Sequence, residues 1–125
     1  LKGTFDCRAP LCANDENLRD VVAKNLNNIG VILEPCNVFE GHYVDENSDF
    51  VQTLLRCYEM YSGKKGECIA IGVGTYVHQI KNGVALWCTM PGTDNNMHVN
   101  DEFAVIDERI LSAKIVTQAI IELCK

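Results

Sequence analysis

Apolar and polar residues alternate over the first nine positions of the chain, LKGTFDCRA. Leu1, Phe5 and Cys7 would share one face of an extended segment, and the charged side chains would share the other. This alternation predicts a strand that ends at Pro10. Three further apolar runs, bounded by glycine or proline, also favour strands, at residues 31–39, 67–74 and 83–90.

Between these runs, apolar residues recur at helical spacing. The first helix is expected to have Asn14 or Asp15 as its N-cap and to stop at Gly30, and the second to span about Asp49 to Ser62. A last helix is expected to start near Asp107, whose carboxylate suits a helix N-terminus. Its apolar stripe is predicted to comprise Ile110, Ala113, Thr117, Ile120 and Cys124, with Leu111 and Ile115 beside it.

The order strand–helix–strand, helix–strand–strand–helix predicts an α/β (α+β) fold with helices packed on a mixed sheet. Taken alone it would also suit a small ferredoxin-like module. The polar stretch EGHYVDENSD marks a candidate boundary near residues 41–48. Since the strand pattern is already running at Leu1, we expect the chain to be a piece of a longer protein.

Composition and charge narrow the function classes. The 125 residues are 47% hydrophobic and 22% charged, the balance of a globular domain. The net charge is −6 and Lys64–Lys65 is the only adjacent basic pair, which disfavours nucleic acid and anionic lipid as partners. No apolar run approaches the roughly 20 residues that span a bilayer, and no secretory signal is visible. We expect a soluble protein.

The cysteines are numerous for this length, but their number is odd and no two have CxxC spacing. This argues against a disulfide framework and against a structural zinc knuckle. Several fall on predicted apolar faces, where a thiol behaves as a small hydrophobe. Reduced cysteines in a cytoplasmic protein are the simplest interpretation of Cys7, Cys12, Cys36, Cys57, Cys68, Cys88 and Cys124.

His98 lies in a polar loop, MPGTDNNMHVNDEF, just before the last helix. Taken alone, a solvated loop histidine is the simpler interpretation, and a metal ligand is the functional one. Zinc needs three or four protein ligands. His42 and His78 sit in unrelated contexts, so any co-ligands of His98 would lie outside these residues.

Two other features could bind a ligand. Arg8 shares the polar face of its predicted strand with Asp6, and this pattern fits equally a surface ion pair and a guanidinium that holds a carboxylate. Gly72 and Gly74, in IGVGTY, would let the backbone approach a ligand closely or would simply form a bulge. The third glycine of a dinucleotide fingerprint and the lysine of a phosphate loop are absent.

Together, DCRAP, GVGTYVHQIKNGVALWCTMPG and MHVNDEF, followed by an amphipathic helix, resemble the C-terminal part of the PepV-type, carnosinase-like (Xaa-His) dipeptidases. These belong to the aminoacylase/carboxypeptidase-type di-zinc metallopeptidases. The resemblance covers nearly the whole chain in the same order. There are two departures: Val73 replaces a glycine of the family loop, and His78 stands where relatives often carry arginine.

The resemblance implies a role for each matching position. His98 would be the last metal ligand, with Glu102 as a support for its loop. Arg8 would hold the free C-terminal carboxylate of the substrate, and the backbone at Gly72 and Gly74 would line the pocket for it. His42 matches no functional position of the family.

The resemblance also implies a domain assignment and an activity. Residues 1–43 would be the end of a ferredoxin-like lid domain, and residues 44–125 a C-terminal segment of the catalytic domain. The complete enzyme would use two zinc ions to hydrolyse dipeptides or short peptides. Because the other ligands and the general base precede the lid in the family, we expect this chain alone to be inactive and not to hold zinc stably.

Two rival interpretations stay open at this stage. One is a non-catalytic small α/β binding or dimerisation module, in which these residues are incidental. The other is a peptidase relative that has lost its metal site and still binds peptides. We also expect self-association, because apolar strand edges without neighbours tend to pair.

Overall fold

The computed structural model describes residues 1–37, 39, 41–86 and 89–125. The chain divides into two compact units. The first comprises Leu1–Tyr43 together with Gly72–Gly74, and the second comprises Val44–Ile71 and Thr75–Lys125. The division between Tyr43 and Val44 falls in the polar stretch EGHYVDENSD. The assignment of the two parts to a lid and a catalytic domain stays a prediction.

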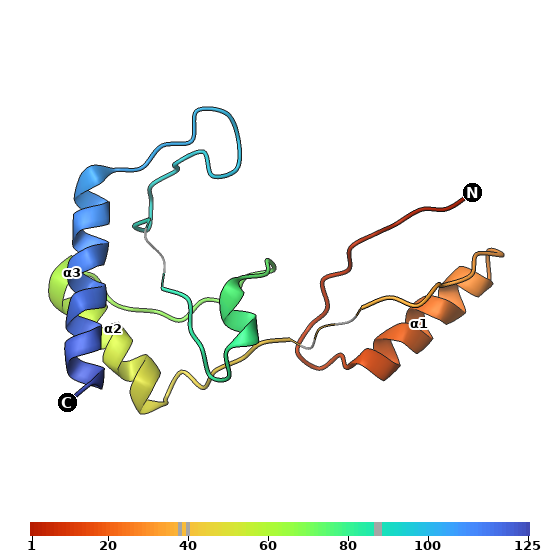
Figure 1. The fold of residues 1–125 in the computed structure, drawn as a ribbon, viewed down its shortest axis with the longest axis horizontal. Helices are drawn as coiled ribbons and strands as arrows, with labels where there is room; N and C mark the ends of the chain where they lie inside the picture. The colour runs from red at the N-terminus through yellow and green to blue at the C-terminus, as the bar shows by residue number, and fades with distance from the viewer. Residues whose placement is uncertain (38, 40, 87–88) are drawn as a thin grey trace. The chain divides into compact units, whose positions relative to one another are not determined.

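The predicted helices are confirmed. α1 spans Asp15–Asn27, α2 spans Asp49–Ser62 and α3 spans Ile106–Leu123 (Figure 1). A short 3-10 helix, η1, spans Tyr76–Gln79 within the segment predicted to lie between two strands. None of the described helices is long and apolar enough to cross a membrane.

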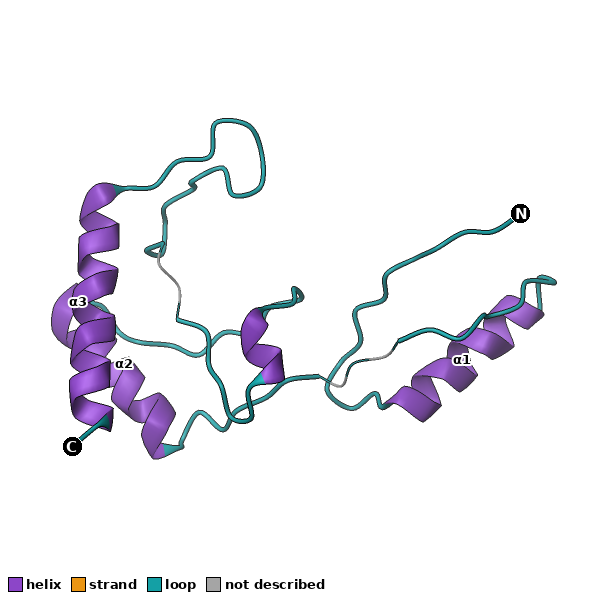
Figure 2. Cartoon of the chain, viewed as in Figure 1, coloured by secondary structure: helices purple, strands orange, loops and turns teal. Residues whose placement is uncertain are grey.

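The predicted sheet is wrong: no strand occurs in the part of the chain that the structure describes (Figure 2). Residue 38 of the second predicted strand and residues 87–88 of the fourth lie outside the described residues. A strand forms only where its backbone pairs with a neighbour, and alternation specifies a face without specifying that neighbour. Residues 1–9 are extended but exposed throughout. The inference that the chain begins within a strand therefore loses its basis.

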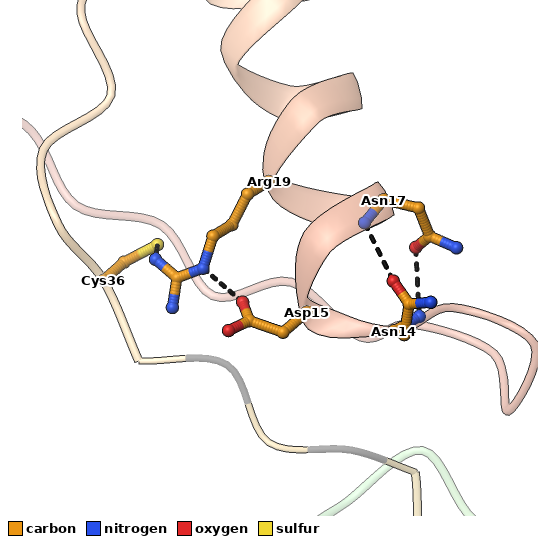
Figure 3. Close-up of polar contacts among 5 residues, drawn as sticks. All are labelled: Asn14, Asp15, Asn17, Arg19 and Cys36. Atoms are coloured by element: carbon orange, nitrogen blue, oxygen red, sulfur yellow. Dashed lines mark hydrogen bonds and ion pairs between the residues drawn. The ribbon is translucent and has the colours of Figure 1, made fainter.

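In the first unit, local side-chain contacts define the start of α1 (Figure 3). The Asn14 side chain accepts from the Asn17 N–H at 2.8 Å, and the Asn17 side chain accepts from the Asn14 N–H at 3.0 Å. This reciprocal capping box provides acceptors for two backbone N–H groups at the start of α1, which have no hydrogen-bond partner within the helix. One turn further, the Arg19 guanidinium is paired with Asp15 and also contacts the Cys36 sulfur at 3.4 Å. It thus ties α1 to the segment that follows it.

α1 buries no residue completely, although Leu18, Val22 and Leu26, which recur at helical spacing, are partly covered. The chain turns back at Gly30, which has a positive φ of 72°. The Val31 N–H then donates to the Leu26 carbonyl at 3.0 Å. Among their described residues, helix and return segment bury no apolar side chain completely.

The second unit contains the core. α2 and α3 pack against each other and, together with Met90, bury a small apolar cluster. Ser48 caps α2 by accepting from the Val51 N–H, and Gly63 ends it in the left-handed conformation with φ 66°. The buried members of the cluster are Leu54, Cys57, Met90, Ile115 and Ala119.

α3 buries a different stripe from the predicted one. Ile115 is 1% exposed, whereas Ile110 and Ile120 on the predicted stripe are 49% and 57% exposed. α3 has apolar residues on several sides, so its sequence alone leaves the buried face open. Packing on α2 selects the neighbouring stripe, which also contains Leu111, Ser112 and Ala119.

Six of the seven cysteines are described, and none of these six forms a disulfide. Only Cys57 is buried, between α2 and α3, where burial raises the pKa of its thiol. The other five are exposed, so among the described cysteines only Cys57 packs in the apolar core. Cys88 lies outside the described residues.

Candidate functional site

His98 lies in the second unit, on the loop that leads from the core residue Met90 into α3. Figure 1 shows this loop, cyan to light blue, extending past the N-terminal end of α3. Three of its non-glycine residues have positive φ: Asn96 at 55°, His98 at 66° and Asp101 at 61°. A positive φ is uncommon for non-glycine residues and costs free energy unless the surroundings impose it.

Hydrogen bonds within the loop hold His98 in this conformation. The His98 N–H donates to the Glu102 carboxylate at 3.2 Å, and the Val99 N–H donates to the Asn96 carbonyl at 3.1 Å. His98 itself is exposed. The Glu102 side chain therefore fixes the backbone that carries the imidazole. The four-residue spacing between them is visible in the sequence.

Four hydrogen bonds tie the base of the loop. The Phe103 N–H donates to the Asn95 carbonyl at 3.2 Å, and the Asn95 amide donates to the Thr89 hydroxyl at 3.3 Å. Glu108, in the first turn of α3, accepts from the Met90 N–H at 3.1 Å and from the Thr93 hydroxyl at 2.5 Å. These bonds join both ends of the loop to the core.

The contacts of Glu108 also affect its ionisation. The hydrogen bond from the Thr93 hydroxyl, followed by that from the Met90 N–H, holds the pKa of the Glu108 carboxyl below its usual value. Sequence reasoning did not identify Glu108. In the sequence, Glu108 is recognisable only as an acidic residue in the first turn of a helix. Such a residue is ordinarily explained by the helix dipole alone.

Arg8 lies in the first unit, in the extended segment before α1. Its guanidinium donates to the Asp6 carboxylate at 2.7 Å, and both side chains are largely exposed. The ion pair that the sequence left open is therefore present. One edge of the guanidinium is engaged, and its exposed position leaves it accessible to another carboxylate.

Gly72 and Gly74 are grouped with the first unit, which also contains Arg8. A Cβ atom added at either glycine would meet no heavy atom within 4 Å, and neither residue has a positive φ. Neither the surrounding described atoms nor the backbone conformation thus requires glycine at these two positions.

The predicted residues fall into two groups. The second unit brings His98 and Glu102 into direct contact, and it also contains His78, in η1. The first unit contains Arg8, Gly72 and Gly74, along with His42.

A metal ion in a protein is held by several side chains that converge on one point. Among the described residues, no three His, Cys, Asp or Glu side chains are placed to do so. A zinc site needs three or four protein ligands, so the described residues do not form one by themselves. His98 fits at most as one ligand of a larger site.

The chain is similar to several proteins named as dipeptidases. It is 42% identical over 97 residues to the Beta-Ala-Xaa dipeptidase of Lactobacillus delbrueckii subsp. lactis, an alignment that covers 77% of this chain and 21% of that protein. It is 40% identical over 84 residues, 67% of the chain and 18% of the relative, to YtjP of Bacillus subtilis, provisionally named a dipeptidase. A provisionally named dipeptidase of Staphylococcus epidermidis is 33% identical over 109 residues, which are 87% of the chain and 23% of the relative.

The expected similarity to dipeptidases is therefore confirmed, and the chain spans about a fifth of the length of the relatives it matches. No protein-family model matches the chain. No solved structure matches it either. The finer placement among PepV-type di-zinc enzymes and the roles of the individual residues stay predictions.

Proposed function

We propose that the chain is the C-terminal portion of a zinc-dependent, PepV-type dipeptidase that hydrolyses dipeptides or short peptides with a free C-terminal carboxylate. The observation that carries the proposal is the 42% identity, over 77% of the chain, to a relative named Beta-Ala-Xaa dipeptidase. The order of the motifs around Arg8, Gly72 and His98 supports it.

In this proposal, His98 contributes one imidazole to a zinc centre, and the other ligands come from residues beyond these 125. The exposed side chain of His98 and the fixed backbone beneath it support this role. Glu102 holds that backbone through the His98 N–H. When bound, zinc would supply a Lewis acid and lower the pKa of a bound water molecule.

Arg8 binds the terminal carboxylate of the substrate, and the backbone at Gly72 and Gly74 lies against the same group. A guanidinium matches a carboxylate with two parallel hydrogen bonds and so fixes its orientation as well as its position. The open surroundings of both glycines and the exposed guanidinium of Arg8 are compatible with this role. Anchoring of the carboxylate would limit substrates to short peptides and place the scissile bond.

The same function implies a domain assignment, a partner and a location for the chain. Residues 1–43 would end the lid domain, residues 44–125 would belong to the catalytic domain, and the remainder of the peptidase would be their partner. The protein would be cytoplasmic and would bind neither nucleic acid nor membranes, in keeping with its net charge of −6. The isolated chain would be inactive, because the other zinc ligands and the general base would lie in the remainder of the peptidase. It would be prone to self-association, because many large apolar side chains are exposed.

Zinc content of the full-length protein tests the proposed role of His98. His98→Ala should lower the zinc bound per molecule, because one ligand is lost, whereas the matched variant His42→Ala should retain the wild-type amount. Elemental analysis after dialysis measures both. Equal zinc in wild type and His98→Ala would contradict the assignment of His98 as a ligand.

A further inference from the structure

Glu108 connects the first turn of α3 to the beginning of the His98 loop. Its two carboxylate oxygens accept from different groups, one from the Met90 N–H and the other from the Thr93 hydroxyl. Met90 is a buried member of the α2–α3 core. A single side chain thus fastens the loop to the core at its first residue and again three residues later.

The contacts continue from Thr93 toward His98. Asp94 follows Thr93 directly and accepts from the Asn96 N–H at 3.2 Å. Asn95 is joined across the loop to Phe103. In the part of the loop between Asn95 and Phe103, the Glu102 carboxylate accepts from the His98 N–H. The peptide bond from Thr93 to Asp94 and these hydrogen bonds connect the base of the loop to His98, so a shift at Thr93 would displace the segment that carries His98.

We propose that Glu108 is a positioning residue for His98, because its carboxylate bridges Met90 and Thr93 and so fixes the base of the loop that presents the imidazole. This inference rests on the proposed function, in which His98 is a metal ligand. Glu108 lies ten positions further along the chain and would touch neither metal nor substrate. It would act by keeping the loop in one arrangement before the ligand binds.

A simpler explanation of Glu108 is favourable interaction with the N-terminal end of the α3 dipole. Asp107 separates the two explanations. It lies in the same first turn and carries the same charge, but among the described residues its carboxylate takes part in no side-chain hydrogen bond or ion pair. A dipole effect would be shared by Asp107 and Glu108, whereas positioning would belong to Glu108 alone.

The test uses the full-length protein with the variants Glu108→Ala, Glu108→Gln and Asp107→Asn. Hydrogen–deuterium exchange of peptides covering residues 90–105 reports on the loop, and chelator competition reports zinc affinity. We expect Glu108→Ala to accelerate exchange in the loop and to lower zinc affinity roughly ten- to a hundredfold, as loss of a supporting group around a metal site does. Glu108→Gln, which keeps an acceptor oxygen, should restore part of both. Asp107→Asn should match wild type.

Thr93→Val provides a second variant if Glu108→Ala does not fold. It removes one of the two donors to Glu108, and its expected effects are in the same direction but smaller. Thermal unfolding of each variant separates a general loss of stability from a local change in the loop. A positioning role predicts lower zinc affinity together with faster exchange confined to the loop, whereas a general loss of stability would also accelerate exchange in α2 and α3.

The outcomes separate this inference from the function on which it rests. If wild type binds zinc and Glu108→Ala binds it with wild-type affinity, positioning by Glu108 is refuted while the proposed function stands. Equal effects of Asp107→Asn and Glu108→Gln would leave only the dipole explanation. If wild type binds no zinc, the proposed function fails and the positioning role fails with it. In that case the exchange data still decide whether Glu108 fastens the loop.

Discussion

At the scale of single residues, the backbone conformation of His98 is the observation that bears most directly on the proposed site. Its φ of 66° is held by the Glu102 carboxylate four residues later. A fixed, exposed imidazole needs less reordering when it binds a ligand than one on an unconstrained loop. The side chain that holds the backbone is therefore as important to the proposed site as the imidazole.

Asp6 competes with the substrate for Arg8 in the proposed enzyme. Asp6→Asn should lower KM for a dipeptide by up to roughly fivefold, because an exposed ion pair contributes only about 0.2–1 kcal/mol that binding must overcome. Steady-state kinetics of the full-length protein measure the change, and kcat should stay the same. A higher KM would mean that Asp6 orients the guanidinium and does not compete for it.

Contacts between residues close together in the sequence could be predicted, whereas contacts between distant residues could not. The pair His98 and Glu102 could be found because the two residues are four positions apart in one loop. The link from Glu108 to Thr93 spans fifteen residues and depends on how the loop folds back on α3. No pattern of residue types specifies such a contact.

At the scale of elements, helices could be predicted and the sheet could not. The start of α1 and the end of α2 are set by Asn14, Asn17 and Gly63, all of which act within one turn of the chain. A strand instead requires a partner from a distant part of the sequence. The apolar run at residues 67–74 has the composition of a strand, but composition does not supply that partner.

The buried face of α3 can be tested with two substitutions of the same residue type. Ile115→Ala should destabilise the chain by about 2–4 kcal/mol, because it leaves a cavity against α2. Ile120→Ala, on the exposed stripe, should change stability by less than about 0.5 kcal/mol. Chemical unfolding followed by circular dichroism measures both free energies. A larger loss for Ile120→Ala than for Ile115→Ala would mean that α3 packs on α2 through the stripe predicted from the sequence.

The lowered pKa of Glu108 makes the link between the loop and α3 sensitive to acid. A group whose pKa is lower in the folded state stabilises that state above its unfolded-state pKa and loses this contribution as pH falls through the folded-state pKa. The difference in melting temperature between wild type and Glu108→Gln should therefore narrow as pH falls through the range in which glutamate titrates. A difference that is constant with pH would show that the ionised carboxylate is not what holds the loop.

At the scale of the whole molecule, the order of the motifs correctly predicted which proteins the chain resembles, whereas the order of the predicted helices and strands did not give the fold. The similarity to dipeptidases was expected from DCRAP, GVGTY and MHVNDEF in that order, and it is confirmed. The α/β fold expected from the same sequence is wrong for the described residues. A short motif can be recognised within a segment that spans about a fifth of its relatives, whereas a sheet depends on every strand that pairs in it.

The most direct test of the central claim is hydrolysis by the full-length protein of a β-alanyl dipeptide and of the same dipeptide with an amidated C-terminus. We predict turnover of the free acid and a kcat/KM roughly ten- to a hundredfold lower for the amide, because Arg8 loses a charged hydrogen-bond partner. Binding of the dipeptide without turnover, or no recognition of either compound, would contradict the account and favour a non-catalytic module.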